Sequence, residues 1–109
     1  MTGKDIMKII ETLSEKISEE IEDAKAYAEM AIEHREDHPD LAQTLYDIST
    51  EEISHMNRLH NAVVKIIEDY RQSRGEPPAE MMAVYDYLHK KQIDKAAHVK
   101  MLQAMFNEN

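Results

Sequence analysis

The sequence has no cysteine, no tryptophan, two glycines and three prolines among its 109 residues. Without cysteine, the chain has no disulfide, no thiolate metal site and no cysteine nucleophile. Its 22 acidic and 13 basic residues give a formal charge of −9, which argues against nucleic acid and anionic membranes as partners. No apolar run approaches the roughly 20 residues that span a bilayer. Charged residues interrupt the first ten positions, unlike a secretory signal. We therefore expect a soluble cytoplasmic protein with one domain over residues 1–109.

The few glycines and prolines divide the chain into three long stretches. Pro39 forms one corner, and Gly75, Pro77 and Pro78 form a second. Proline ends or begins helices and glycine is favoured just beyond their ends. This distribution predicts an all-α fold with three helices, over about residues 4–37, 40–74 and 78–107. Because both connections are short, sequential helices are expected to be antiparallel neighbours.

Apolar residues recur at steps of three and four in each stretch, which indicates one buried face per helix. The predicted faces are Ile6, Ile10, Leu13, Ile17, Glu20, Ala24, Tyr27 and Ala31, then Leu41, Leu45, Ile48, Glu52, His55, Leu59, Ala62, Ile66 and Tyr70, and finally Met81, Tyr85, Leu88, Gln92, Lys95, Val99, Leu102 and Phe106. Each face is interrupted near its middle by polar residues. Since a buried carboxylate is costly unless it is paired or bound to a metal, these positions need an explanation.

Three of these polar residues are predicted to converge. Folding the chain about residue 38 places Glu20 opposite Glu52 and His55, whose i, i+3 spacing puts both side chains on one face of a helix. Two carboxylates and one imidazole suit iron, manganese or zinc. Tyr27 follows Glu20 by two helical turns on the same face, where its hydroxyl is expected to orient a ligand or a water in the second shell.

Glu20-x6-Tyr27 on one helix and Glu52-x-x-His55 on the next resemble the first half of a ferritin-like domain of the rubrerythrin type. The resemblance covers roughly residues 6–70. It implies a carboxylate-bridged di-metal centre that oxidises Fe(II), stores iron, or reduces peroxide or O₂. It also implies that Glu20 is a terminal or bridging ligand, that Glu52 bridges the metals and that His55 is a terminal ligand.

The chain departs from a complete ferritin-like site. Such a site takes a Glu from each of two helices and a Glu-x-x-His from each of two others, which is twice what this chain supplies. A homodimer of hairpins would complete it, in the manner of encapsulated ferritins, so a dimer or larger homo-oligomer is predicted. The cysteine-rich module of complete rubrerythrins is missing, so redox turnover would need an external electron donor. The resemblance therefore implies ferroxidase or peroxidase-like chemistry, and it names no separate catalytic residue.

Other interpretations remain open from the sequence. Lys95 and Gln92 can close a metal-free ionic network with Glu20 and Glu52, which would leave a helical adaptor or assembly module. Asp94 and His98, spaced i, i+4, can add ligands in a monomer. They share a second, partly apolar face of the third helix, which is expected to pack on another subunit. That face comprises Ala83, Tyr87, Asp94, His98, Met101 and Met105.

Overall fold

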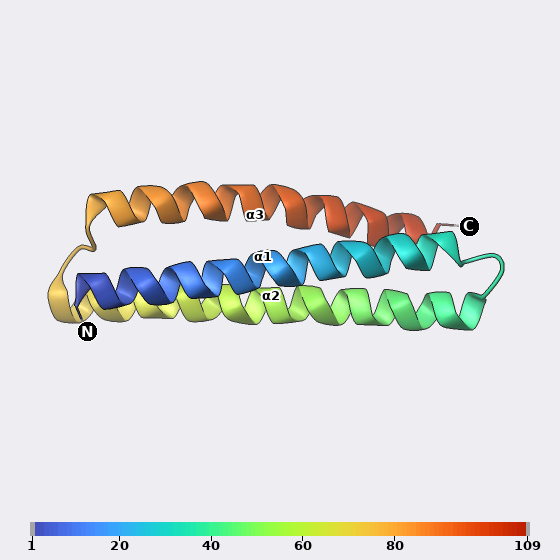
Figure 1. Ribbon diagram of the computed structural model, residues 1–109, viewed down its shortest axis with the longest axis horizontal. Coiled ribbons are helices and arrows are strands. Elements are labelled where there is room, and N and C mark those ends of the chain that lie inside the picture. The colour runs from blue at the N-terminus through green and yellow to red at the C-terminus, as the bar shows by residue number, and fades with distance from the viewer. Residues whose placement is uncertain (1, 109) are drawn as a thin grey trace.

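The computed structural model describes residues 2–108 and contains three helices: α1 (Gly3–Glu33), α2 (Pro39–Arg74) and α3 (Ala79–Phe106). They form an elongated bundle of 56 × 18 × 17 Å, in which α1 and α2 run side by side and α3 lies along α1 (Figure 1). The all-α fold with three long helices is confirmed. In the described part of the chain, no helix is both long enough and apolar enough to traverse a bilayer.

The helix ends follow from local chemistry. Thr2 caps α1: its hydroxyl accepts a hydrogen bond from the Asp5 backbone N–H at 3.2 Å, and its own N–H donates to the Asp5 carboxylate at 3.1 Å. Pro39 occupies the first turn of α2, and Gly75 ends that helix at φ +86°, a conformation that favours glycine. The first helix ends at Glu33, earlier than the expected residue 37, since the chain turns over residues 34–37 before Pro39.

Small residues let α1 and α2 approach closely. Ala24, Ala28 and Ala31 of α1 are fully buried, as are Ala42 and Ser49 of α2. A small side chain at a helix crossing allows the backbones to approach. The Ser49 hydroxyl donates to the Ala24 carbonyl oxygen at 2.7 Å. The hairpin is therefore the more tightly packed part of the bundle.

The third helix is held by polar contacts as well as by apolar burial. Met81, Ala96, Val99 and Phe106 are its buried apolar residues. The Gln92 side chain donates to the Ser14 carbonyl oxygen at 3.1 Å. These contacts fix which side of the hairpin α3 covers.

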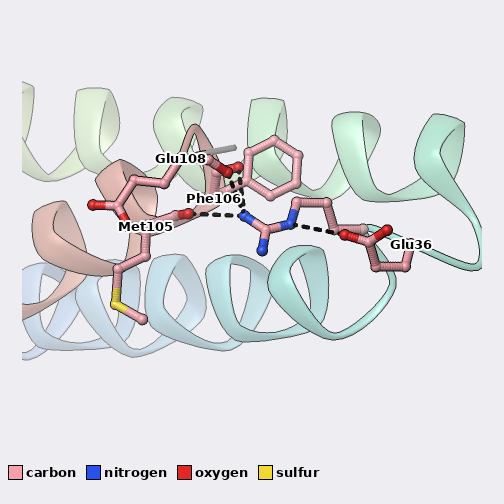
Figure 2. Close-up of polar contacts among 5 residues, drawn as sticks. Glu36, Met105, Phe106 and Glu108 are labelled. Atoms are coloured by element: carbon pink, nitrogen blue, oxygen red, sulfur yellow. Dashed lines mark hydrogen bonds and ion pairs between the residues drawn. The ribbon is translucent and has the colours of Figure 1, made fainter.

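An arginine from the α1–α2 corner binds the C-terminal end of α3. The Arg35 guanidinium donates from Nη1 to the carbonyl oxygens of Met105, Phe106 and Glu108 at 2.9, 3.1 and 3.0 Å (Figure 2). The last carbonyls of a helix lack partners within the helix, and a cation there also interacts favourably with the helix dipole. Arg35 therefore ties the end of α3 to the far end of the hairpin.

The buried faces of α1 and α2 match the predicted faces only in part, and they are shifted by one residue near the candidate ligands. In α2 the buried residues Ser49, Ile53 and Met56 each follow a predicted position by one, whereas Glu52 is half-buried and His55 is exposed. In α1 the buried Ile21 follows Glu20 in the same way. The buried residues of α1 still form one stripe, but it follows the predicted stripe by one residue at Ser14, Ile21 and Ala28. The physical reason is that small residues such as Ala28 and Ser49 fill the close contact between α1 and α2, which leaves larger or charged side chains such as Tyr27 at its edge.

Candidate metal centre

Glu20, Glu52 and His55 lie together across the α1–α2 hairpin. One ligand atom from each lies within 4.8 Å of the others. His55 Nδ1 is 3.5 Å from Glu20 Oε2 and 3.8 Å from Glu52 Oε1. The three side chains therefore lie at the same position along the hairpin, as predicted, and α1 and α2 alone bring them together.

The three side chains differ in exposure. The carboxylate side chains are 24% exposed for Glu20 and 18% for Glu52, whereas the His55 side chain is 50% exposed. The site therefore lies at the edge of the helix–helix contact and opens to the surface. It is not the buried layer in the middle of the bundle that the sequence predicts.

The cluster faces away from α3. Ser18 and Glu22 both contact α3, through Gln92 and Lys95 respectively. Glu20 is two residues from each of them, which corresponds to a rotation of about 200° around the helix. A shallow groove at the site is lined by Glu20, His55, Arg58 and Leu59, all from the hairpin. Hence the candidate centre lies on the side of the hairpin opposite α3.

The carboxyl groups of Glu20 and Glu52 repel each other when both are ionised. Interaction with the Glu20 carboxylate, reinforced by burial, raises the pKa of Glu52 to about 7 from 4.5, and His55 only partly offsets this effect. Glu20 Oε2 is buried and accepts no hydrogen bond from the described residues. A proton held between the two carboxyl groups, or a cation beside them, would relieve the repulsion. Either would give the buried oxygen a partner.

The remaining side of the hairpin is partly apolar. Here we define the open face as the side of α1 and α2 that carries Glu20, Glu52 and His55 and is left uncovered by α3. Its apolar members are half-buried, apart from the exposed Leu41, and comprise Ile9, Leu13, Tyr27, Leu41, Ile48, Leu59 and Ile66. These side chains flank the candidate centre on both sides along the helices.

Two predicted neighbours of the site have other partners. Tyr27 lies on the open face but packs with Ala31 and Leu45 in the core cluster at the far end of the bundle, and its hydroxyl forms no hydrogen bond with Glu20, Glu52 or His55. Lys95 is exposed and lies 3.8 Å from the Glu22 carboxylate, so the predicted network of Lys95 with Glu20 and Glu52 is wrong. The cause is again the position of α3, which covers the opposite side of α1.

The other polar positions of α3 also do not reach the centre. Gln92 is buried as predicted, but its amide bonds to α1. Asp94 and His98 are exposed and line a shallow groove with Glu22 and Lys25, not with Glu20. They are therefore not additional ligands of this cluster. One residue that the sequence analysis missed is Arg58, which lines the hairpin groove one helical turn after His55. It belongs to no motif that would single it out.

Comparisons of this chain with protein-family models, with curated proteins and with solved structures find no match.

Proposed function

We propose that the chain binds a divalent transition metal through Glu20, Glu52 and His55, and that it belongs functionally with the ferritin-like proteins. The observation that carries the proposal is the convergence of three ligand atoms within 4.8 Å on a face that no other part of residues 2–108 covers. Carboxylate oxygen combined with imidazole nitrogen suits Fe(II), Mn(II) or Zn(II). Iron is the metal that the resemblance favours.

The state of the two carboxyl groups supports a cation at this position. The Glu20 carboxylate raises the proton affinity of Glu52, so ionisation of Glu52 has an energetic cost in the metal-free protein. A divalent cation removes that cost, and it gives the buried Glu20 Oε2 a partner. The donor set therefore fits a metal better than it fits an isolated polar layer.

Three ligands from one chain leave a metal site incomplete, so we propose that a second copy supplies the rest. A two-fold dimer through the open face would bring together four Glu and two His side chains, the inventory of a di-metal carboxylate centre. The half-buried apolar residues around the cluster support this interface, because a second copy would cover them. All of α3 would remain outside it, because α3 packs on the other side of the hairpin.

Bound iron at such a centre would supply one-electron exchange with O₂ or peroxide, which is ferroxidase or peroxidase-like chemistry. The chain contributes the carboxylates that balance the metal charge and the imidazole that fixes one coordination position. Because the chain has no cysteine, repeated turnover would take its electrons from a separate donor.

The test is anaerobic titration of EDTA-dialysed protein with Fe(II), followed by calorimetry, in the wild type and in Glu52→Gln and His55→Ala. We expect saturation near one metal per chain, with at least tenfold weaker binding in both variants. Glu51→Gln is the matched control, since Glu51 is exposed and adjacent in sequence but outside the cluster. Equal binding by Glu52→Gln and Glu51→Gln would contradict the proposal.

A metal-free adaptor is the alternative function, and one observation favours it. The outer face of α3 exposes Tyr87, Met101 and Met105, which are apolar side chains typical of protein contacts. In this case EDTA would leave the thermal stability unchanged, and added Fe(II) would not raise it. The metal-binding proposal expects Fe(II) to raise the melting temperature, because a ligand that binds only the folded state stabilises it.

A further inference from the structure

A groove separates α2 from α3 on the side of the bundle away from α1. It encloses about 270 Å³, somewhat less than a typical drug-sized pocket. Ten residues line it: Ile17, Met56, Asn57, His60, His89, Gln92, Ile93, Ala96, Ala97 and Lys100. None of them belongs to the candidate metal centre, so this second site stands independently of the proposed function.

The middle of the groove is apolar. Ile17 and Met56 are buried beneath it, and Ala96 is the buried apolar residue of α3 that borders it. Ile93 leaves 54% of its surface exposed at the rim. The small side chains of Ala96 and Ala97 leave the space that larger side chains would fill. The middle of the groove is therefore suited to a flat apolar body.

Stacked rings form one end of the groove. The rings of His60 and His89 lie 4.5 Å apart with an angle of 8° between their planes, and Tyr85 stacks on the other side of His89 at 5.6 Å. Burial and the neighbouring His89 both lower the pKa of His60. The lowered pKa favours the neutral form of His60, so its ring offers an aromatic surface at this end of the groove.

Two polar groups give the groove a direction. Gln92 is only 8% exposed, and its Nε2 donates to the Ser14 carbonyl oxygen and the Ser18 hydroxyl. Its carboxamide oxygen accepts no hydrogen bond from residues 2–108, which leaves an acceptor in the groove wall. Lys100 lies at the end opposite the histidines, eleven residues along α3 from His89, or about 16 Å. Its ammonium forms no ion pair within the described chain.

From these features we infer that the α2–α3 groove binds a small aromatic monocarboxylate whose ring carries an N–H or O–H donor. The ring occupies the apolar middle, its donor reaches the Gln92 carboxamide oxygen, and its carboxylate points toward Lys100. The lining of the groove favours an anion at this place, because it contains Lys100 and no carboxylate. A ligand of this class gives both the Gln92 carboxamide oxygen and the Lys100 ammonium a partner.

The experiment uses three matched probes with the full chain: indole-3-acetate, 1-naphthaleneacetate, which lacks the ring N–H, and 3-methylindole, which lacks the carboxylate. Because the chain has no tryptophan, the fluorescence of the indole probes reports binding directly. Amide chemical shifts in NMR spectra monitor all three probes. We expect saturable binding of indole-3-acetate, with shifts concentrated at His60, Gln92 and Ala97. Each of the other two probes should bind about fivefold more weakly, the loss expected for one hydrogen bond or one exposed ion pair.

Variants of the protein test the same geometry. Ala97→Leu fills the groove from an exposed position and should abolish binding, and Lys100→Gln should weaken indole-3-acetate but not 3-methylindole. Lys91→Gln is the control, since Lys91 lies on the outer side of α3 over the Tyr87 ring. Failure of indole-3-acetate to saturate, shifts located outside the groove, or equal binding by Ala97→Leu would each overturn the inference.

Discussion

Nδ1 of His55 lies 3.5 Å from Oε2 of Glu20, an oxygen that has no hydrogen-bond donor in the described chain. The two residues come from different helices and are 35 positions apart. Their approach depends on the close crossing of α1 and α2 at the small residues Ala24 and Ser49. The candidate centre is therefore a property of the hairpin, and α3 contributes nothing to it directly.

The first prediction concerns the pH dependence of stability in EDTA. The pKa of Glu52 is about 7 in the folded protein and near 4.5 when unfolded. Its protonation therefore stabilises the fold fully below about pH 4.5, and this contribution is lost as the pH rises through 7. Glu52→Gln removes the repulsion with Glu20 permanently. At pH 8 it should increase the free energy of unfolding by about 1–2 kcal/mol, measured by urea denaturation.

A second measurement of the unfolding free energy at pH 5 distinguishes the titration of Glu52 from that of the other acidic residues. At pH 5 the wild type and Glu52→Gln should have nearly equal stability, because Glu52 is then protonated in the folded state. Glu51→Gln should follow the wild type at both pH values, since Glu51 is exposed. An unchanged difference between pH 5 and pH 8 would argue against a shared proton at Glu52.

The second prediction is that metal binding releases a proton near neutral pH. A metal-bound Glu52 carboxylate must be ionised, whereas about half of the metal-free protein carries a proton there at pH 7. Affinity for Mn(II), which is stable in air, should therefore fall as the pH drops from 8 to 6. Calorimetry in two buffers of different ionisation enthalpy measures the proton release. Its absence in the wild type would contradict the assignment of Glu52.

The third prediction tests the hydrogen bonds that join all three helices. The buried Ser49 hydroxyl donates to the Ala24 carbonyl and accepts from the Gln103 amide at 2.9 Å. Ser49→Ala leaves the Gln103 amide without this partner and should cost about 1–2 kcal/mol in urea denaturation. Ser54→Ala, an exposed serine five residues further along α2, should change the stability by less than about 0.5 kcal/mol. Equal effects of the two variants would contradict this interpretation.

The fourth prediction concerns Arg35 and the end of α3. Arg35→Ala removes the donor to three carbonyl oxygens and should destabilise the last turn of α3, at a cost of about 1–2 kcal/mol. Hydrogen exchange should accelerate at Gln103–Asn107 while the middle of α1 stays protected. Arg74→Ala, at an exposed arginine, should leave that exchange unchanged. Uniform acceleration along the whole chain would show that Arg35 acts on global stability instead.

The helices were predictable because their ends depend on local chemistry. Pro39 and Gly75 act through their own backbone restrictions, so their positions alone indicate two of the boundaries. The positions of Glu20, Glu52 and His55 along the hairpin were predictable for a similar reason. A short loop between two antiparallel helices fixes which residues lie opposite each other.

The rotation of the helices and the position of α3 were not predictable in the same way. Residues such as Ala28 and Ser49 are buried because they are small, and an apolar pattern weighted toward large side chains passes over them. Lys95 belongs to the predicted apolar face of the third helix, but it is exposed beside Glu22, since α3 packs on only one side of α1. Which side it covers depends on specific contacts such as that of Gln92 with Ser14, and no periodicity encodes these contacts.

We propose that two chains share a metal centre formed by Glu20, Glu52 and His55 on the open face. Native mass spectrometry of protein loaded anaerobically with Fe(II) measures subunit number and metal content together. We expect a dimer, or a larger assembly of dimers, that carries two metals per pair of chains, and loss of the metal in Glu52→Gln. A metal-free monomer from the wild-type chain under the same conditions would contradict it.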